Sequence, residues 1–223
     1  MTAELLPSIE LETAPNPGAS VIWLHGLGAD GNDFVPIVPE LGLPPSKPTR
    51  FVFPHAPVRA VTINNGFRMR AWYDIAAADL TNRADLAGVR DSQALIEALI
   101  AREKTRGAPA ARIVLAGFSQ GGAIALHLAL REPRRLAGVI ALSTYLPLAP
   151  TLKREKSTAN ASLPIFMAHG EYDPVIPLAH AETSRRILER EGYVIDWHVY
   201  PIPHSVCAPE IAAIGAWLGG LDG

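Results

Sequence analysis

A serine between two glycines, in the stretch GFSQGG, is the feature of this sequence that most directly suggests chemistry. Gly117, Ser119 and Gly121 form the pattern G-x-S-x-G, which can mark a sharp strand-to-helix turn that exposes a nucleophilic serine. The apolar run RIVLAG precedes the serine, and the helix-like run GGAIALHLAL follows it. This setting favours a catalytic Ser119 over an ordinary turn serine, because glycines lack the Cβ atoms that would crowd such a turn.

A serine hydroxyl needs a base, and the base needs an acid that orients it. In the fold that carries this turn, the order along the chain is serine, acid, histidine. Asp173 follows the apolar run LPIFMAHG and is followed by a proline, so it sits in a rigid turn. His204 lies in the loop PIPHSVC after the last expected strand. We therefore expect Ser119, Asp173 and His204 to form a catalytic triad.

Other acids and histidines suit these roles less well. Glu171 shares the turn with Asp173 but lacks the proline beside it, and Asp196 falls in the middle of an expected strand. His180 falls in a helix-like segment and His198 in a strand, where a surface or packed side chain is the simpler interpretation.

Two backbone N–H groups must hold the negative oxygen of an acyl-transfer intermediate. Gln120 follows the nucleophile, and Leu27 in the glycine-rich loop LHGLGADGNDF (24–34) is the best candidate for the second donor. The same loop spells G-x-G-x-x-G, a pattern of dinucleotide sites. Such a site needs an acid at the end of the next strand, which here ends in PHA (54–56) instead. No cofactor is therefore expected.

The remaining histidines have simpler interpretations than metal binding. His25, His55 and His169 lie at strand ends, and no H-x-x-H or H-E-x-x-H spacing occurs. We expect them to hydrogen-bond to loop backbones around the site, and we expect no metal. His127 lies among apolar residues in the helix after Ser119 and is expected in the core.

The elements that must position these residues follow from short apolar runs that alternate with helix-like segments. Strands are expected at 20–26, 50–57, 112–117, 136–143, 163–170 and 194–201, and helices at about 85–102, directly after Ser119, at 179–191 and at 210–218. This alternation predicts an α/β fold with a mostly parallel central sheet flanked by helices. Ligands of such sheets bind beyond the carboxyl ends of the strands.

Three segments fall outside this alternation. Asn65-Gly66, within 62–74, is a hairpin-turn signal in a small β excursion. The segments 41–48 and 146–162 are expected to be loops.

Composition limits the function classes. The chain has 223 residues, 48% of them hydrophobic and 19% charged, so we expect one domain over 1–223 with a large core. Lysine and arginine total 20 and aspartate and glutamate 22, a net charge of −2 without like-charge blocks, which argues against nucleic-acid partners. No secretory signal or apolar run long enough to cross a membrane is present, so a cytoplasmic location without integral membrane association is expected.

Cys207 is the only cysteine, which rules out an intrachain disulfide and a multi-cysteine zinc site. We expect its thiol to be buried and inert rather than reactive. The sequence leaves the oligomeric state open, a homodimer included.

Seven motifs, in chain order, carry a resemblance to a known family: LHGLGADGNDF, FPHAP, RAWYD, GFSQGG, ALSTYLP, MAHGEYDPVIP and HSVCAPE. From about residue 21 to 218 the chain resembles the carboxylesterase and acyl-protein thioesterase (phospholipase/carboxylesterase) branch of the α/β-hydrolases. The resemblance implies an α/β-hydrolase fold without a large lid domain, no cofactor, and ester or thioester hydrolysis through an acyl-enzyme. It places the triad on Ser119, Asp173 and His204. Pro203 departs from the glycine that this family often has before the histidine.

The resemblance also implies where the acyl group lies. Trp72, Tyr145 and Leu146 match segments that flank the site in this family, while Val175 and Ile176 follow the acid and add apolar wall. The substrate class stays open between a small ester or thioester, a lysophospholipid and an acylated protein.

Rival functions share the fold. A dienelactone hydrolase is disfavoured by serine in place of cysteine at 119, and a large peptidase by the lack of a gating domain. A non-catalytic binding protein on this scaffold is disfavoured because all three triad candidates are present.

Overall fold

The computed structural model describes residues 5–76 and 85–221. A seven-stranded sheet in the order β1-β3-β2-β6-β7-β8-β9 forms its centre. Its strands are β1 (Ser8–Glu12), β2 (Ala19–Leu24), β3 (Thr49–Pro54), β6 (Ile113–Phe118), β7 (Gly138–Leu142), β8 (Ile165–Gly170) and β9 (Ile195–Tyr200). The helices are α1 (Leu86–Thr105), α2 (Gln120–Arg131), α3 (Leu152–Glu155), α4 (Leu178–Arg190) and α5 (Ala208–Gly220).

Every strand of this sheet except β1 runs parallel to its neighbours, as expected from the alternation of strands and helices. β1 was not anticipated and pairs antiparallel with β3, so that Ile9 lies opposite Phe53. Its sequence SIELE alternates apolar and charged residues, because only one face of this edge strand is covered. The carboxyl ends of the six parallel strands meet at one edge of the sheet.

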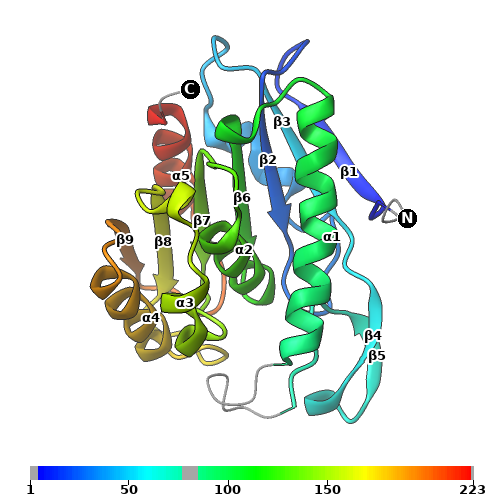
Figure 1. Ribbon diagram of the computed structural model, residues 1–223, viewed down its shortest axis with the longest axis vertical. Coiled ribbons are helices and arrows are strands. Elements are labelled where there is room, and N and C mark those ends of the chain that lie inside the picture. Colours follow the sequence, from blue (N-terminus) through cyan, green and yellow to red (C-terminus); the bar gives the residue numbers. More distant parts are fainter. Residues whose placement is uncertain (1–4, 77–84, 222–223) are drawn as a thin grey trace.

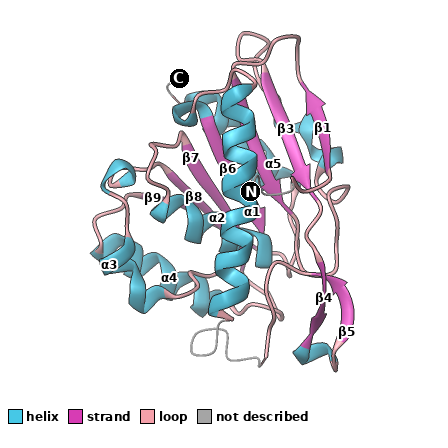
Figure 2. Ribbon diagram, turned by 45° about the vertical axis from the view of Figure 1, so that its right-hand side comes forward, coloured by secondary structure: helices cyan, strands magenta, loops and turns pink. Residues whose placement is uncertain are grey.

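The two faces of the sheet bury separate cores, which explains why the strands lack strict alternation. On β2, Ile22 and Leu24 point into the core beneath α1, α2 and α4, while Val21 and Trp23 point into the core beneath α5. Figures 1 and 2 show α1 and α2 crossing one face and α5 lying behind the other. α2 has the most buried sequence of the helices, with Gln120 to Leu130 all buried.

A two-stranded hairpin of β4 (Val58–Val61) and β5 (Phe67–Arg70) extends beyond the carboxyl edge of the sheet (Figure 2). Asn65 and Gly66 occupy its turn with φ of 53° and 74°, as the hairpin signal predicts. The hairpin begins four residues earlier than the expected segment, because Val58 and Arg59 also pair across it.

The expectation that 146–162 is a loop was wrong. This segment contains α3 and two short 3-10 turns, and the Leu152 side chain is fully buried against the core. Four residues are too few to produce a helical periodicity that a sequence pattern can reveal.

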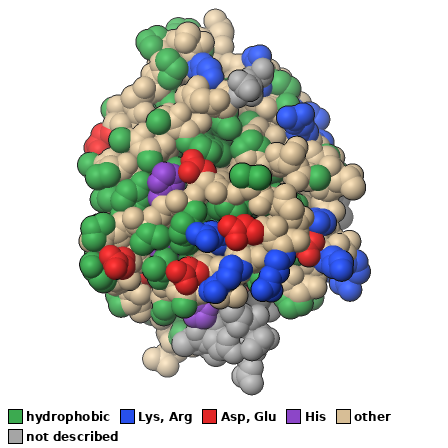
Figure 3. Space-filling model, turned by 90° about the vertical axis from the view of Figure 1, so that its left-hand side faces the viewer, with side chains coloured by type: hydrophobic (Ala, Val, Ile, Leu, Met, Phe, Trp, Pro, Cys, Tyr) green, Lys and Arg blue, Asp and Glu red, His purple; other side chains and the backbone are tan. Residues whose placement is uncertain are grey.

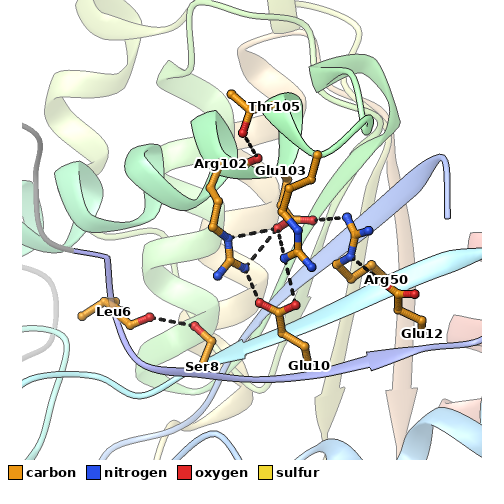
Figure 4. Close-up of polar contacts among 9 residues, drawn as sticks. Leu6, Ser8, Glu10, Glu12, Arg50, Arg102, Glu103 and Thr105 are labelled. Atoms are coloured by element: carbon orange, nitrogen blue, oxygen red, sulfur yellow. Dashed lines mark hydrogen bonds and ion pairs between the residues drawn. The ribbon is translucent and has the colours of Figure 1, made fainter. Parts of the chain in front are cut away.

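A buried ion-pair cluster joins β1 and β3 to the end of α1 (Figure 4). The Glu103 carboxylate, whose side chain is 0% exposed, accepts hydrogen bonds from Arg50, Arg102 and Arg106. Glu10 on β1 pairs in turn with Arg102 and Arg106, at 2.8 Å each. The cluster fastens the antiparallel edge strand to the C-terminal end of α1.

The opposite edge of the molecule, formed by β9 and α4, carries both signs of charge side by side (Figure 3). Two pairs one helical turn apart on α4, Arg185 with Glu189 and Arg186 with Glu182, account for part of this mixture. Alternating charges of this kind give this face no basic field for nucleic acid. No helix within the described ranges is long and apolar enough to span a membrane.

Candidate active site

Ser119 occupies a strained turn between β6 and α2. Its backbone has φ of 55° and ψ of −122°, a region that residues with a side chain rarely adopt. The Ser119 N–H donates to the Leu142 carbonyl at 2.9 Å, and the Thr144 hydroxyl donates to the Ser119 carbonyl at 2.7 Å. These contacts hold the backbone of the turn in place.

The glycines on either side of Ser119 are required by close backbone approach. A Cβ at Gly117 would lie 2.4 Å from the Gly121 carbonyl carbon, and one at Gly121 would lie 2.4 Å from the Leu24 carbonyl oxygen. The first helical turn of α2 therefore rests directly on the loop that follows β2. This is the physical basis of the G-x-S-x-G pattern in this chain.

The three residues expected to form a triad lie within hydrogen-bond distance of one another. Ser119 Oγ is 3.0 Å from His204 Nε2, and His204 Nδ1 is 2.6 Å from Asp173 Oδ2. Ser119 follows β6, Asp173 follows β8 and His204 follows β9. The ends of three different strands therefore bring the three side chains together. The proline at 203 does not prevent this geometry. The Phe118 ring, 4.7 Å from the His204 ring between centroids, packs against the imidazole.

The Asp173 carboxylate is fully buried and oriented by backbone donors. Its Oδ1 atom accepts the N–H groups of Val175 at 2.8 Å and Ile176 at 2.9 Å. Oδ2 is thereby left to face His204. The carboxylate is thus held in one orientation by the turn that contains it.

The two expected oxyanion donors adjoin the serine. Within the described residues, neither the Leu27 N–H nor the Gln120 N–H donates to a protein acceptor. The Gly28 N–H, in contrast, is occupied by the Arg70 carbonyl at 2.9 Å. A Cβ built at Gly26 would lie 3.5 Å from Ser119 Cβ, so this loop borders the nucleophile. Gln120 also begins α2, whose positive dipole end favours an oxyanion there.

The Gln120 side chain has a second, structural role. Its Oε1 accepts the Trp72 N–H and its Nε2 donates to the Tyr73 carbonyl, both at 2.8 Å. The Ser92 hydroxyl holds the Trp72 carbonyl from α1. The segment after the hairpin is therefore tied to the residue that we expect to supply an oxyanion donor.

The histidines at strand ends hydrogen-bond to loop backbones, as predicted. His25 contacts the Gly26 carbonyl at 2.7 Å through Nδ1 and accepts the Ala56 N–H at 3.0 Å through Nε2. His55 accepts the Gly31 N–H at 3.0 Å. Burial lowers the pKa of His25, although the Gly26 carbonyl opposes this effect. His127 is buried in the core, where burial lowers its pKa to about 3.

Most of the residues expected to line the acyl pocket are buried. Trp72, Tyr145, Leu146 and Ile176 are at most 5% exposed, whereas Val175 is 60% exposed. The Trp72 indole donates to the His25 carbonyl, and the Tyr145 hydroxyl lies 2.7 Å from that of Tyr73. These contacts give Trp72 and Tyr145 a structural role, and their contact with an acyl group stays a prediction.

The less suitable candidates lie away from the serine. His198 and Asp196 pair with each other on β9 at 2.9 Å, and His180 lies in α4. Cys207 precedes the first residue of α5 and is only half-buried, so the expectation of a buried thiol was wrong. Throughout 5–76 and 85–221, no group of three or more histidine, cysteine, aspartate or glutamate side chains is arranged to hold a metal.

A mostly parallel sheet flanked by helices, with a serine in a strained turn after a central strand, defines an α/β-hydrolase. The chain belongs to the phospholipase/carboxylesterase family of that fold, whose model matches residues 8–219.

Relatives and solved structures agree with this assignment. The chain is 39% identical to acyl-protein thioesterase 1 of Neurospora crassa, covering 96% of this chain and 89% of that protein. It is 36% identical to acyl-protein thioesterase 1 of Yarrowia lipolytica, with coverage of 95% and 96%. Among crystal structures, acyl-protein thioesterase 2 of Zea mays superposes with a TM-score of 0.83 at 29% identity over 95% of this chain and 97% of that one. Arabidopsis thaliana SOBER1 superposes with a TM-score of 0.84 at 27% identity, with coverage of 90% and 97%.

Proposed function

We propose that this chain is a serine hydrolase that cleaves carboxylic esters or thioesters through an acyl-enzyme on Ser119, and that residues 1–223 form its single catalytic domain. The observation that carries the proposal is the contact series from Ser119 Oγ to His204 Nε2 at 3.0 Å and from His204 Nδ1 to Asp173 Oδ2 at 2.6 Å. It joins a nucleophile to a base and the base to an orienting acid.

In the first half of the reaction, Ser119 Oγ attacks the acyl carbon while His204 Nε2 takes the hydroxyl proton. The carbonyl oxygen becomes negative and receives hydrogen bonds from the Leu27 and Gln120 N–H groups. Asp173 stabilises the charged imidazole and keeps its tautomer. His204 then gives the proton to the departing alcohol or thiol, which leaves the acyl group on the serine.

In the second half, water attacks the acyl-enzyme and His204 accepts a proton from that water. Collapse of the second tetrahedral intermediate releases a carboxylate and restores the Ser119 hydroxyl. The residues that carry out both halves are the same, so no group beyond those of the chain is required.

The names of the relatives favour an acylated protein thioester as the natural substrate. The fungal relatives are acyl-protein thioesterases at 36–39% identity over 90–96% of this chain. A small ester and a lysophospholipid are the alternatives that a substrate series separates. A cytoplasmic location and a homodimer stay predictions.

The test is hydrolysis of p-nitrophenyl esters from acetate to palmitate, together with the matching acyl thioesters. We expect Ser119→Ala to lower kcat by roughly 10⁶-fold, because the nucleophile acts as a unit with its base. Ser46→Ala, which alters an exposed serine, is the matched control and should keep full activity. A fluorophosphonate should add to the wild type at Ser119 and not to the alanine variant.

The hydrolysis assay tests both the catalytic role of Ser119 and the substrate class. A wild type inert toward every ester and thioester, or an alanine variant as active as the wild type, would overturn the proposal in favour of a binding protein. A higher kcat/KM for thioesters than for the matched esters would support the thioesterase assignment, and the chain-length optimum would identify the acyl group.

A further inference from the structure

A second histidine lies beside the acid of the contact series. His169, near the end of β8, has a side chain that is only 1% exposed. Its Nε2 atom is 2.8 Å from the Ile176 carbonyl oxygen and 3.4 Å from Asp173 Oδ2. The same Asp173 oxygen that meets His204 therefore has His169 as its neighbour.

The contacts of His169 define its tautomer. A carbonyl oxygen only accepts hydrogen bonds, so Nε2 must carry the hydrogen that reaches Ile176. Nδ1 then carries a lone pair, and it is buried without a partner among the described residues. Burial lowers the pKa of His169, opposed by the Ile176 carbonyl and Asp173, so the ring is neutral at pH 7. The titratable groups that face it are Asp173, His204 and, from α4, His180.

The bond from His169 closes the loop that carries the acid. Ile176 donates its N–H to Asp173 Oδ1 and accepts the His169 hydrogen at its carbonyl. The far end of the loop, at Ile176, is thereby fastened back to β8, the strand from which the loop begins. Because Oδ1 is held by the amides at this end, the direction of Oδ2 toward His204 depends on where Ile176 lies.

We propose that His169 is a positioning residue for the acid: as a neutral Nε2–H donor to Ile176, it holds the 170–176 loop so that Asp173 Oδ2 meets His204 Nδ1. The proposal rests on the function proposed above for the roles of Asp173 and His204. His169 is not a second base, since its Nε2 atom faces Ile176 and Asp173 and makes no contact with Ser119.

Two substitutions separate the donor from the bulk of the ring. His169→Phe keeps a planar ring and removes the N–H, whereas His169→Gln keeps an N–H donor at a similar reach. His198→Phe, on the neighbouring strand β9 and away from Asp173, is the matched control. Should the phenylalanine variant fail to fold, His169→Leu is the second donor-free variant.

The measurements are kcat, KM and the pH profile of kcat/KM on one p-nitrophenyl ester, with the melting temperature of each variant. We expect the donor-free variant to lose about tenfold in kcat with KM within about twofold, since small displacements of catalytic groups act on the chemical step. The acid-side midpoint of kcat/KM should fall, because a displaced carboxylate no longer favours the charged base. His169→Gln should recover both values, and His198→Phe should leave them unchanged.

A second readout does not depend on turnover. The hydrogen between His204 and Asp173 should give a far-downfield proton NMR signal in the wild type and His169→Gln, and the signal should move or vanish in the donor-free variant. An unchanged signal, an unchanged kcat and an unchanged pH midpoint in a folded donor-free variant would overturn the proposal. Equal losses in the glutamine and donor-free variants would also overturn it. Failure of the proposed function looks different: the wild type is then inert, while the signal still follows the donor.

Discussion

Ser119 Oγ and His204 Nε2 lie 3.0 Å apart although 85 residues separate them in the chain. For the serine to donate its hydrogen, Nε2 must present a lone pair, and the hydrogen of the neutral imidazole must then sit on Nδ1. Nδ1 faces the Asp173 carboxylate, which accepts that hydrogen. The tautomer of His204 is therefore set by Asp173.

Replacing Asp173 with asparagine should reverse this tautomer. Oδ1 of Asp173 accepts two backbone N–H groups, so the amide oxygen of asparagine will take that position and its NH₂ will face His204 Nδ1. His204 Nδ1 must then accept a hydrogen bond from this NH₂ group, so the ring hydrogen sits on Nε2 and faces Ser119. We expect Asp173→Asn to lower kcat by about 10⁴-fold, measured in steady state on a p-nitrophenyl ester.

The matched control for this change is Asp196→Asn, which alters an exposed aspartate on β9. It should keep wild-type kcat. An Asp173→Asn variant that stays within about tenfold of the wild type would contradict the tautomer argument.

Glu210 should make the fold less stable as the pH rises from about 4.5 to about 7. It is 1% exposed in the first turn of α5, and the Cys207 backbone N–H lies at its carboxylate. Burial raises its pKa from 4.5 to about 7, with the Cys207 backbone amide opposing the shift. From pH 4.5 to 7 the unfolded chain gives up this proton while the folded chain keeps it, so stability falls through that range.

Glu210→Gln removes the titration and should gain stability relative to the wild type by about 2–3 kcal/mol between pH 5 and pH 8. Urea unfolding at the two pH values measures this gain. Glu40→Gln changes an exposed carboxylate and should leave the pH dependence as it is. If the free energy of unfolding changed with pH by the same amount in the wild type and in Glu210→Gln, Glu210 would not titrate as described.

Glu103 should have the opposite pH dependence. Burial raises its pKa, but the Arg50 hydrogen bond and the charges of Arg106, Arg102 and Arg50 bring it below 4.5. Because the pKa of Glu103 is lower in the folded chain than in the unfolded chain, its ionised form stabilises the fold. This stabilisation is complete above the pKa of the unfolded chain and is lost as the pH falls through the pKa of the folded chain. The fold should therefore lose stability below about pH 4.5 partly through this cluster.

Glu103→Gln removes the buried carboxylate charge that Arg50, Arg102 and Arg106 share, and it should cost about 3 kcal/mol at pH 7. Glu189→Gln is the comparison, because its ion pair with Arg185 is at the surface and is worth under about 1 kcal/mol. Urea unfolding at pH 7 compares the loss of stability in Glu103→Gln with that in Glu189→Gln. Equal, small losses would mean that the buried cluster contributes no more than a surface pair.

The catalytic candidates and the parallel sheet could be predicted because local patterns carry them. G-x-S-x-G reflects backbone contacts of Gly117 and Gly121, and the order of Ser119, Asp173 and His204 follows the order of strand ends. Their meeting within 3.0 Å confirms the expected geometry. What they do in a reaction stays a proposal.

Other features depend on contacts that no local pattern records. β1 has a half-polar sequence because only one of its faces is covered, and α3 is four residues long. The fixed tautomer of His169 depends on the Ile176 carbonyl, and the Trp72 N–H donates to the side chain of Gln120, 48 residues away. The packing of Phe118 against His204 was also missed, although its position directly before Ser119 in the motif places it at the site.

The contact between Gly121 and the loop after β2 limits how this scaffold can diversify. There the backbone of Gly121 packs against the backbone of Leu24 and His25, and no space is left for a Cβ atom. No side chain fits at Gly121, so main-chain packing fixes the turn that carries Ser119. The hairpin and the acid loop expose the side chains of Phe67, Tyr172 and Val175 to solvent, so we expect these positions to tolerate replacement. We therefore expect substrate preference to change through the hairpin and the acid loop rather than through the turn at Gly121.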